Sequence, residues 1–125
     1  MTDASEILAM IEAVDPRDTE KLDEIDARMF CLISNIPWER YKFCQGKQWG
    51  QTKIEKYDFI PEYSRSRDAL KQIRPDGWDF KNHSAGHCWG NKILNHEIKV
   101  QSSEYTEELA ELHAIIQAIE FERTK

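Results

Sequence analysis

Apolar residues near the start of the chain recur at helical spacing and predict a short first helix. Four of them share one helical face: Ile7, Leu8, Ile11 and Val14. Asp15-Pro16 ends the segment, because a residue before proline is pushed out of the helical region. Since the helix is short and close to the terminus, we expect residues 1–16 to form an N-terminal helix or arm.

A longer amphipathic pattern follows and predicts a second helix of about four turns. Its core-facing stripe consists of Leu22, Ile25, Met29, Leu32, Ile33 and Ile36. Asp18 or Thr19 can cap its start, and Pro37 closes it. Beyond this helix the pattern is less regular. We expect strands at Tyr41–Cys44 and Trp49–Phe59, in an edge position or with one solvated face, because buried aliphatic residues are few there.

The middle of the chain, Tyr63–Phe80, predicts a capped helix, a tight turn and a strand in succession. Ser64 is the expected N-cap of that helix. Its apolar side consists of Ala69, Leu70 and Ile73. Pro75-Asp76-Gly77 predicts a turn, since proline fixes φ and glycine accepts a positive φ. Trp78 and Phe80 then alternate as in a strand, and we expect Trp78 to lie in the core.

Two further strands and a last helix complete the pattern. Gly86–Leu94 and Glu97–Gln101 predict a strand pair that turns at Asn95-His96. Thr106 can cap the last helix. The apolar face of that helix consists of Leu109, Leu112, Ile115, Ile116 and Ile119.

This order of elements predicts an α+β protein with an antiparallel sheet of about four strands. We expect the sheet to be sandwiched between helical layers (α/β/α), in a single domain over residues 17–125. A chain of 125 residues is long enough to bury one core without disulfides or metals.

Charge is unevenly distributed along the chain, although its net value is −6. Residues 1–35 carry 9 acidic and 3 basic side chains, and residues 102–125 carry 6 and 2. Residues 36–101 are mildly basic, with 8 acidic and 12 basic side chains. The negative total disfavours direct DNA binding, which depends on neutralising phosphates, but it leaves room for a local basic face.

The sequence contains no membrane-spanning run, signal peptide or disulfide framework, and this predicts the location of the protein and the state of its cysteines. No apolar run approaches the roughly 18 residues that span a bilayer, and the acidic N-terminus does not resemble a signal peptide. Three widely spaced cysteines, Cys31, Cys44 and Cys88, do not make a disulfide framework and fit reduced thiols. We therefore expect a cytoplasmic protein with no membrane partner.

Three blocks of the sequence stand out as a set: Leu22–Met29, the run from Pro61–Ser64 into the Gly77-Trp78 turn, and Thr106–Leu112. These blocks resemble the small phage proteins that carry the "phage ABA sandwich" domain. Together they cover roughly residues 19–122. The resemblance implies an antiparallel sheet between helical layers, a phage origin and hence the host cytoplasm. It implies no catalytic residues.

This chain departs from the family pattern in three ways. It carries an extra N-terminal helix, its final helix is more acidic than the usual alanine-rich one, and Trp38–Gln51 has no equivalent.

A basic cluster on the central helix is the first candidate site. It consists of Arg65, Arg67, Lys71 and Arg74. At a helix N-terminus, Arg65 and Arg67 would suit a phosphate, a nucleotide or an acidic partner surface. The alternative is a solvated helix face that pairs with the acidic terminal helices. Trp38, Trp49 and Trp89 have no assigned place in the core, and tryptophan is enriched at interaction hot spots, so Trp89 joins the candidates; core packing is the alternative for all three.

Metal binding and catalysis have weaker support. His83, His87, Cys88 and His96 only roughly imitate zinc-ligand spacing, and surface histidines are the expected interpretation; we predict no metal or cofactor. Cys44 or Cys88 would need a nearby base to act as a nucleophile, and His87 falls on the opposite strand face from Cys88. A turn role for Asp76 and a solvated Asp79 explain that carboxylate pair.

The leading hypothesis is a non-enzymatic phage accessory protein that binds a host or phage macromolecule and inhibits a host defence system. A protein partner is favoured, and a homodimer stays open. The alternative is a nucleotide or small-ligand binding (sequestering) protein that uses Arg65 and Arg67 with a tryptophan platform. An enzyme ranks below both.

Overall fold

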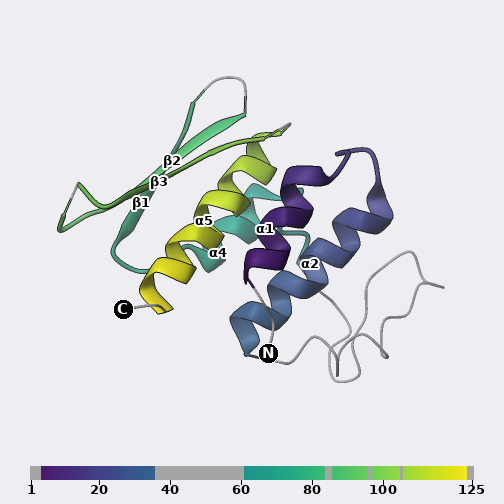
Figure 1. The fold of residues 1–125 in the computed structure, drawn as a ribbon, viewed down its shortest axis with the longest axis horizontal. Helices are drawn as coiled ribbons and strands as arrows, with labels where there is room; N and C mark the ends of the chain where they lie inside the picture. Colours follow the sequence, from purple (N-terminus) through teal and green to yellow (C-terminus); the bar gives the residue numbers. More distant parts are fainter. Residues whose placement is uncertain (1–3, 36–60, 84–85, 96, 105, 124–125) are drawn as a thin grey trace. The chain divides into compact units, whose positions relative to one another are not determined.

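The computed structural model describes residues 4–35, 61–83, 86–95, 97–104 and 106–123 (Figure 1). The elements in chain order are α1 (Ala4–Ala13), α2 (Thr19–Ser34), α4 (Arg67–Ile73), β1 (Trp78–His83), β2 (His87–Lys92), β3 (Lys99–Ser103) and α5 (Glu107–Arg123). Helix α5 packs against a three-stranded antiparallel sheet and α4 packs against α5, which confirms the predicted α+β class. The strands expected at Tyr41–Cys44 and Trp49–Phe59 lie outside the described residues.

The chain divides into two compact units, an N-terminal unit (Met1–Ser64) and a C-terminal unit (Arg65–Lys125). In the N-terminal unit α1 packs against α2 and buries the predicted Ile7 and Ile11 completely. The first helix is therefore one half of a helical pair. The predicted single domain over residues 17–125 stays a prediction.

Helix α2 begins and ends through local caps. The Asp18 side chain accepts a hydrogen bond from the Lys21 N–H at 3.3 Å, and Asn35 closes the helix in the left-handed conformation with φ 58°. The predicted core stripe is confirmed at its buried members, Leu22, Ile25, Met29 and Leu32. Ile33 was wrongly placed in it. The Ile33 side chain is 39% exposed, because it lies in the last turn, where the helix is about to end.

The segment before α4 is held by a buried carboxylate. Asp26, on α2, accepts a hydrogen bond from the Ser64 N–H at 2.8 Å. Burial, and secondarily the Asp26 charge, raise the pKa of the neighbouring Tyr63.

The prediction that Ser64 caps the central helix was wrong. Ser66 takes that role, and its Oγ accepts from the Ala69 N–H at 3.3 Å.

The turn between α4 and β1 follows the prediction. Arg74 is already extended, with φ −61° and ψ 127°, as expected for a residue that precedes proline. Gly77 adopts φ 83°, which favours glycine. Trp78 then enters the core, where its ring lies 6.3 Å from that of Phe80 and 5.9 Å from that of Phe121.

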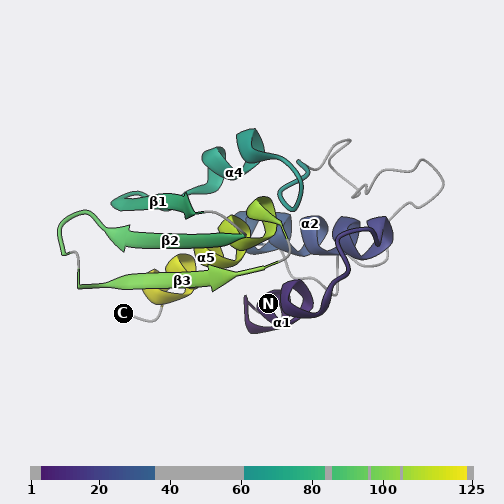
Figure 2. The same cartoon turned by 90° about the horizontal axis from the view of Figure 1, so that it is seen from above.

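The sheet has the order β1-β2-β3, and Figure 2 shows the three strands side by side. Alternation along β2 buries Cys88 and Gly90 and exposes His87 and Trp89. One face of the sheet therefore packs against α5, and the other face is exposed. The hairpin turn is wider than predicted, since the Ile98 N–H donates to the Asn95 carbonyl at 3.0 Å and β2 already ends at Lys92.

Helix α5 covers the inner face of the sheet and contacts all three strands and α4 (Figure 1). It begins as predicted, with the Thr106 hydroxyl accepting from the Leu109 N–H at 3.1 Å. Its buried residues are Leu109, Ala110, Glu111, Leu112, Ala114, Ile115, Ile116 and Ala118. Neither α5 nor any other helix in the described ranges is long and apolar enough to cross a membrane.

Gly90→Ala should destabilise the protein by about 1–3 kcal/mol through overpacking. A Cβ at this position would lie 2.5 Å from Phe80 Cε1 and 3.0 Å from Val100 Cγ2, on the neighbouring strands. Urea unfolding measures the effect. Ser103→Ala, at an exposed position on β3, is the control and should change the free energy of unfolding by less than about 0.5 kcal/mol. Equal stability of the two variants would contradict the close packing.

Candidate functional site

The predicted basic cluster does not form one exposed patch. Arg65 precedes the Ser66 cap and is part-buried, while Lys71 is exposed. Arg67, at the first position of α4, forms an ion pair with Glu107 in the first turn of α5, and both side chains are about half-exposed. The helix end that was expected to receive an external anion therefore already has an acidic neighbour from the chain itself.

Arg74 is engaged by a buried carboxylate. Its guanidinium reaches both oxygens of Glu111, with Nη2 3.0 Å from Oε1 and Nε 3.2 Å from Oε2. Asn82 adds a hydrogen bond of 2.8 Å to Oε1. Glu111 is only 1% exposed, so the contacts from Arg74 and Asn82 offset the free-energy cost of removing its carboxylate from water. The alternative of pairing with the acidic terminal helix therefore holds for Arg67 and Arg74.

The candidate metal ligands cannot be assembled from the described residues. His96 lies outside them, and the structure does not describe the side chain of His83. His87 and Cys88 point to opposite faces of β2, as predicted, one exposed and the other buried. Across the described ranges, no group of three His, Cys, Asp or Glu side chains is placed to hold a metal ion.

The cysteines and carboxylates do not form a reactive centre where they are described. Burial raises the pKa of the Cys88 thiol to about 12, and burial does the same for Cys31. Both are therefore protonated, weak nucleophiles at neutral pH. Cys44 lies outside the described residues. Asp76 and Asp79 are exposed, as expected for a turn residue and a solvated strand residue.

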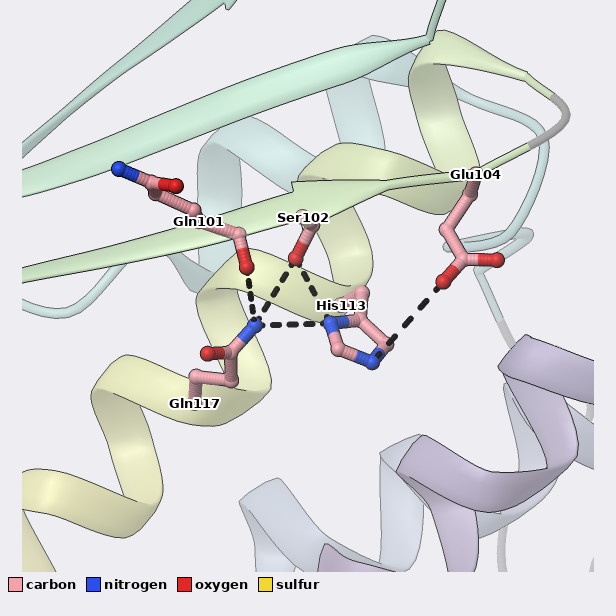
Figure 3. A network of polar contacts seen from close by, with 5 residues as sticks. All are labelled: Gln101, Ser102, Glu104, His113 and Gln117. Carbon is pink, nitrogen blue, oxygen red and sulfur yellow. Dashed lines mark hydrogen bonds and ion pairs between the residues drawn. The ribbon is translucent and has the colours of Figure 1, made fainter.

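A polar network joins β3 to α5 (Figure 3). Ser102 Oγ lies 2.7 Å from His113 Nδ1, and His113 Nε2 lies 4.0 Å from a Glu104 carboxylate oxygen. The Gln117 amide nitrogen donates at 2.9 Å both to the Gln101 carbonyl and to Ser102 Oγ. It also lies 2.8 Å from His113 Nδ1.

This network places a serine, a histidine and a carboxylate in the order of a nucleophile, its base and an orienting group. The serine is not available for attack, however. Ser102 is only 7% exposed, and its hydroxyl also accepts a hydrogen bond from Gln117, so an external substrate has little access to it. The Gln117 amide nitrogen donates its two N–H groups to the Gln101 carbonyl and to Ser102 Oγ, so the Ser102 hydroxyl donates to Nδ1 of His113. The arrangement therefore holds the edge of β3 against α5.

Sequence reasoning missed this network. Its signal is the spacing of His113 and Gln117, four residues apart on the last helix, which places two polar side chains on one face. Ser102 belongs to the strand before that helix, and only the packing of α5 on the sheet brings it into reach.

Exposed apolar side chains gather on one hairpin. Trp89 on β2 is 48% exposed, and in the turn that follows Ile93 is 54% and Leu94 97% exposed. Trp89 pairs across the sheet with Lys81 and Gln101. Of the predicted binding residues, Trp89 is thus the one that the structure places on an open sheet surface, and Ile93 and Leu94 are additions to it.

Comparison with known proteins found no matching family model, no matching curated protein and no matching solved structure.

Glu111→Gln should destabilise the protein by about 2–4 kcal/mol, because it leaves the Arg74 guanidinium beside a neutral group in a mostly buried site. Glu107→Gln is the matched control, on the same helix and also paired with an arginine, and should cost less than about 1 kcal/mol since its pair is half-exposed. Chemical denaturation of both variants makes the comparison. Similar losses would show that the buried carboxylate has no special role.

Thiol labelling tests the two buried cysteines in a Cys44→Ser background. At pH 8 a thiol with a pKa of about 12 is ionised to roughly 1 part in 10⁴, so Cys31 and Cys88 should react only after denaturation. Because both folded pKa values are raised above 9.0, the stability that they contribute is complete below pH 9 and declines as the pH rises towards 12. Rapid labelling of the folded protein at pH 8 would contradict this burial.

Proposed function

We propose that this chain is a non-enzymatic binding protein that engages a protein partner through the tip of the β2–β3 hairpin. One observation carries the proposal. Of the four large apolar side chains that are exposed within the described ranges, three lie between Trp89 and Leu94. Scattered exposed apolar residues need no explanation, but a group of them on one projecting element is typical of an interaction site.

Leu94 is the strongest member of this group. At 97% exposure its side chain makes almost no contact within the chain, so it adds no packing energy to the fold. Burying such a side chain against a partner is worth about 1.5–3 kcal/mol. The neighbouring Ile93 is held in place by its backbone, whose N–H donates to the Gly77 carbonyl at 2.9 Å. The tip therefore presents adjacent apolar side chains on an anchored backbone.

The arginines of the basic cluster favour a protein partner over a nucleotide. Arg67 pairs with Glu107 and Arg74 with Glu111, so an incoming phosphate would have to compete with carboxylates of the chain itself. An apolar hairpin tip has no such competitor. It fits a groove lined by apolar side chains on another protein.

The finer parts of the proposal rest on the sequence resemblance to phage ABA sandwich proteins. They are a phage accessory role, the host cytoplasm as location and the inhibition of a host defence system. If these parts hold, the partner is a protein of the bacterial host or of the phage itself, and it should be sought in those two sets of proteins.

Leu94→Gln should reduce partner capture at least about tenfold without changing stability, because it removes apolar contact area and leaves the fold untouched. The assay is affinity capture from host and phage-infected lysates, followed by titration of the purified partner. Glu97→Gln, another exposed position in the same loop, is the control and should bind like wild type. A wild-type chain that captures nothing above the Leu94→Gln background would overturn the proposal.

A further inference from the structure

The exposed face of the sheet carries an ordered pattern of charges around a central tryptophan. The strand register sets Asp79, Asn91 and Lys99 in one row across the sheet, and Lys81, Trp89 and Gln101 in the next. Asn91 is half-buried, and the other five are exposed. We call these six residues the open face. Figure 2 shows the three strands that carry the two rows.

The charges on the open face are arranged so that the face complements itself. Asp79 lies on β1 at one end of its row and Lys99 lies on β3 at the other end, with β2 between them. A two-fold axis that runs along β2 turns the β1 side of one copy towards the β3 side of the other. Asp79 of each copy then meets Lys99 of the other, and this opposite-charge contact occurs twice.

We propose that the open face is a self-association surface on which a second copy of this chain packs about that axis. The second row fits the same arrangement. Lys81 of one copy faces Gln101 of the other, whose side chain can accept from the ammonium group. Trp89 lies on the axis and stacks against Trp89 of the second copy, where the two rings exclude water from the charged contacts.

The charges and Trp89 together favour this axis over one that runs across the strands. Through the second row, such an axis would set Lys81 of one copy against Lys81 of the other, and like charges in contact are unfavourable. Between the two rows, it would pair Asp79 with Lys81 but would set Trp89 against Asn91, so the two tryptophans would not stack. Face-to-face sheets pack about 10 Å apart with their strands within about 30° of each other. At that spacing a lysine side chain from one sheet reaches a carboxylate on the other.

The size of the face predicts a weak dimer. Three strands about 4.8 Å apart and two rows about 6.6 Å apart (two residues of about 3.3 Å each) give a footprint of roughly 200 Å² on each copy. That lies below the range of stable, specific interfaces, so we expect a transient dimer with a dissociation constant of about 0.1–1 mM.

Self-association uses Trp89, whereas partner binding at the hairpin tip uses Ile93 and Leu94. These two residues lie in the turn beyond β2 and are not part of the open face. An axis along β2 leaves the β2 strands of the two copies pointing the same way, so both tips project from the same end of the dimer. Two tips on one particle would strengthen binding to a repetitive partner through effective concentration.

Sedimentation equilibrium of the full chain from 10 μM to 1 mM tests the proposal. Wild type should show a monomer–dimer equilibrium, and Trp89→Ala should weaken it at least about tenfold. Asp79→Lys and Lys99→Glu each replace both attractive contacts by repulsive ones and should each weaken it by about tenfold or more. Lys71→Glu, an exposed charge reversal on α4, should dimerise like wild type.

Mixing the two charge variants gives the decisive result. In a mixed dimer of Asp79→Lys with Lys99→Glu, both contacts again join opposite charges, so the mixture should dimerise although neither variant does alone. The double variant Asp79→Lys/Lys99→Glu should dimerise with itself. Thermal melting confirms that each variant is folded, and a misfolded variant would not be rescued by mixing. A wild-type monomer at 1 mM, or failure of both the mixture and the double variant to dimerise, would overturn the proposal.

Discussion

The C-terminal unit depends on a carboxylate that has been taken out of water. Glu111 projects from α5 towards the end of α4 and the strand β1, and it survives there because Arg74 and Asn82 donate to its two oxygens. Removing a charge from water costs several kcal/mol unless such donors are in place. The geometry of α4, the turn that follows it and β1 must therefore agree with the position of α5. The N-terminal unit uses the same device on a smaller scale, since the buried Asp26 accepts the Ser64 backbone N–H and so ties that segment to α2.

The internal ion pairs and hydrogen bonds lie on the face of the sheet that α5 covers, and the exposed side chains lie on the other face. On the inner face, acidic side chains of α5 engage the arginines of α4, and the Ser102–His113–Gln117 network holds β3. Arg67 and Arg74, which the sequence suggested as ligand-binding residues, instead pair with carboxylates of α5 and so position α4 against that helix. The outer face carries exposed side chains that no helix of this unit covers, and the hairpin beyond it ends in Leu94. The surfaces that we propose for a second copy and for a partner both lie away from the basic cluster.

Elements whose signals are local could be predicted from the sequence. The stripe of α2, the Thr106 cap of α5 and the glycine turn before Trp78 each depend on residues within one or two turns of each other. Predictions failed where a distant group intervened. Ser64 has the chemistry of an N-cap, but its N–H is bound by Asp26, 38 residues away, and the helix starts after Ser66 instead. The role of His113 could not be predicted, because the serine that it contacts belongs to another element.

The sequence by itself determined the class of fold, the helices, the Thr106 cap of α5, and the alternation that buries Cys88 and exposes Trp89, since these follow from periodicity and backbone chemistry. Only the tertiary structure decided which charged residues are used internally. The sequence does not distinguish the four members of the basic cluster, Arg65, Arg67, Lys71 and Arg74. Ion pairing depends on distances of 3–4 Å, and the packing of α4 against α5 sets these distances. The strand register likewise decided that Asp79, Trp89 and Lys99 share one face in a self-complementary order, because pairing between strands is a non-local property of the chain.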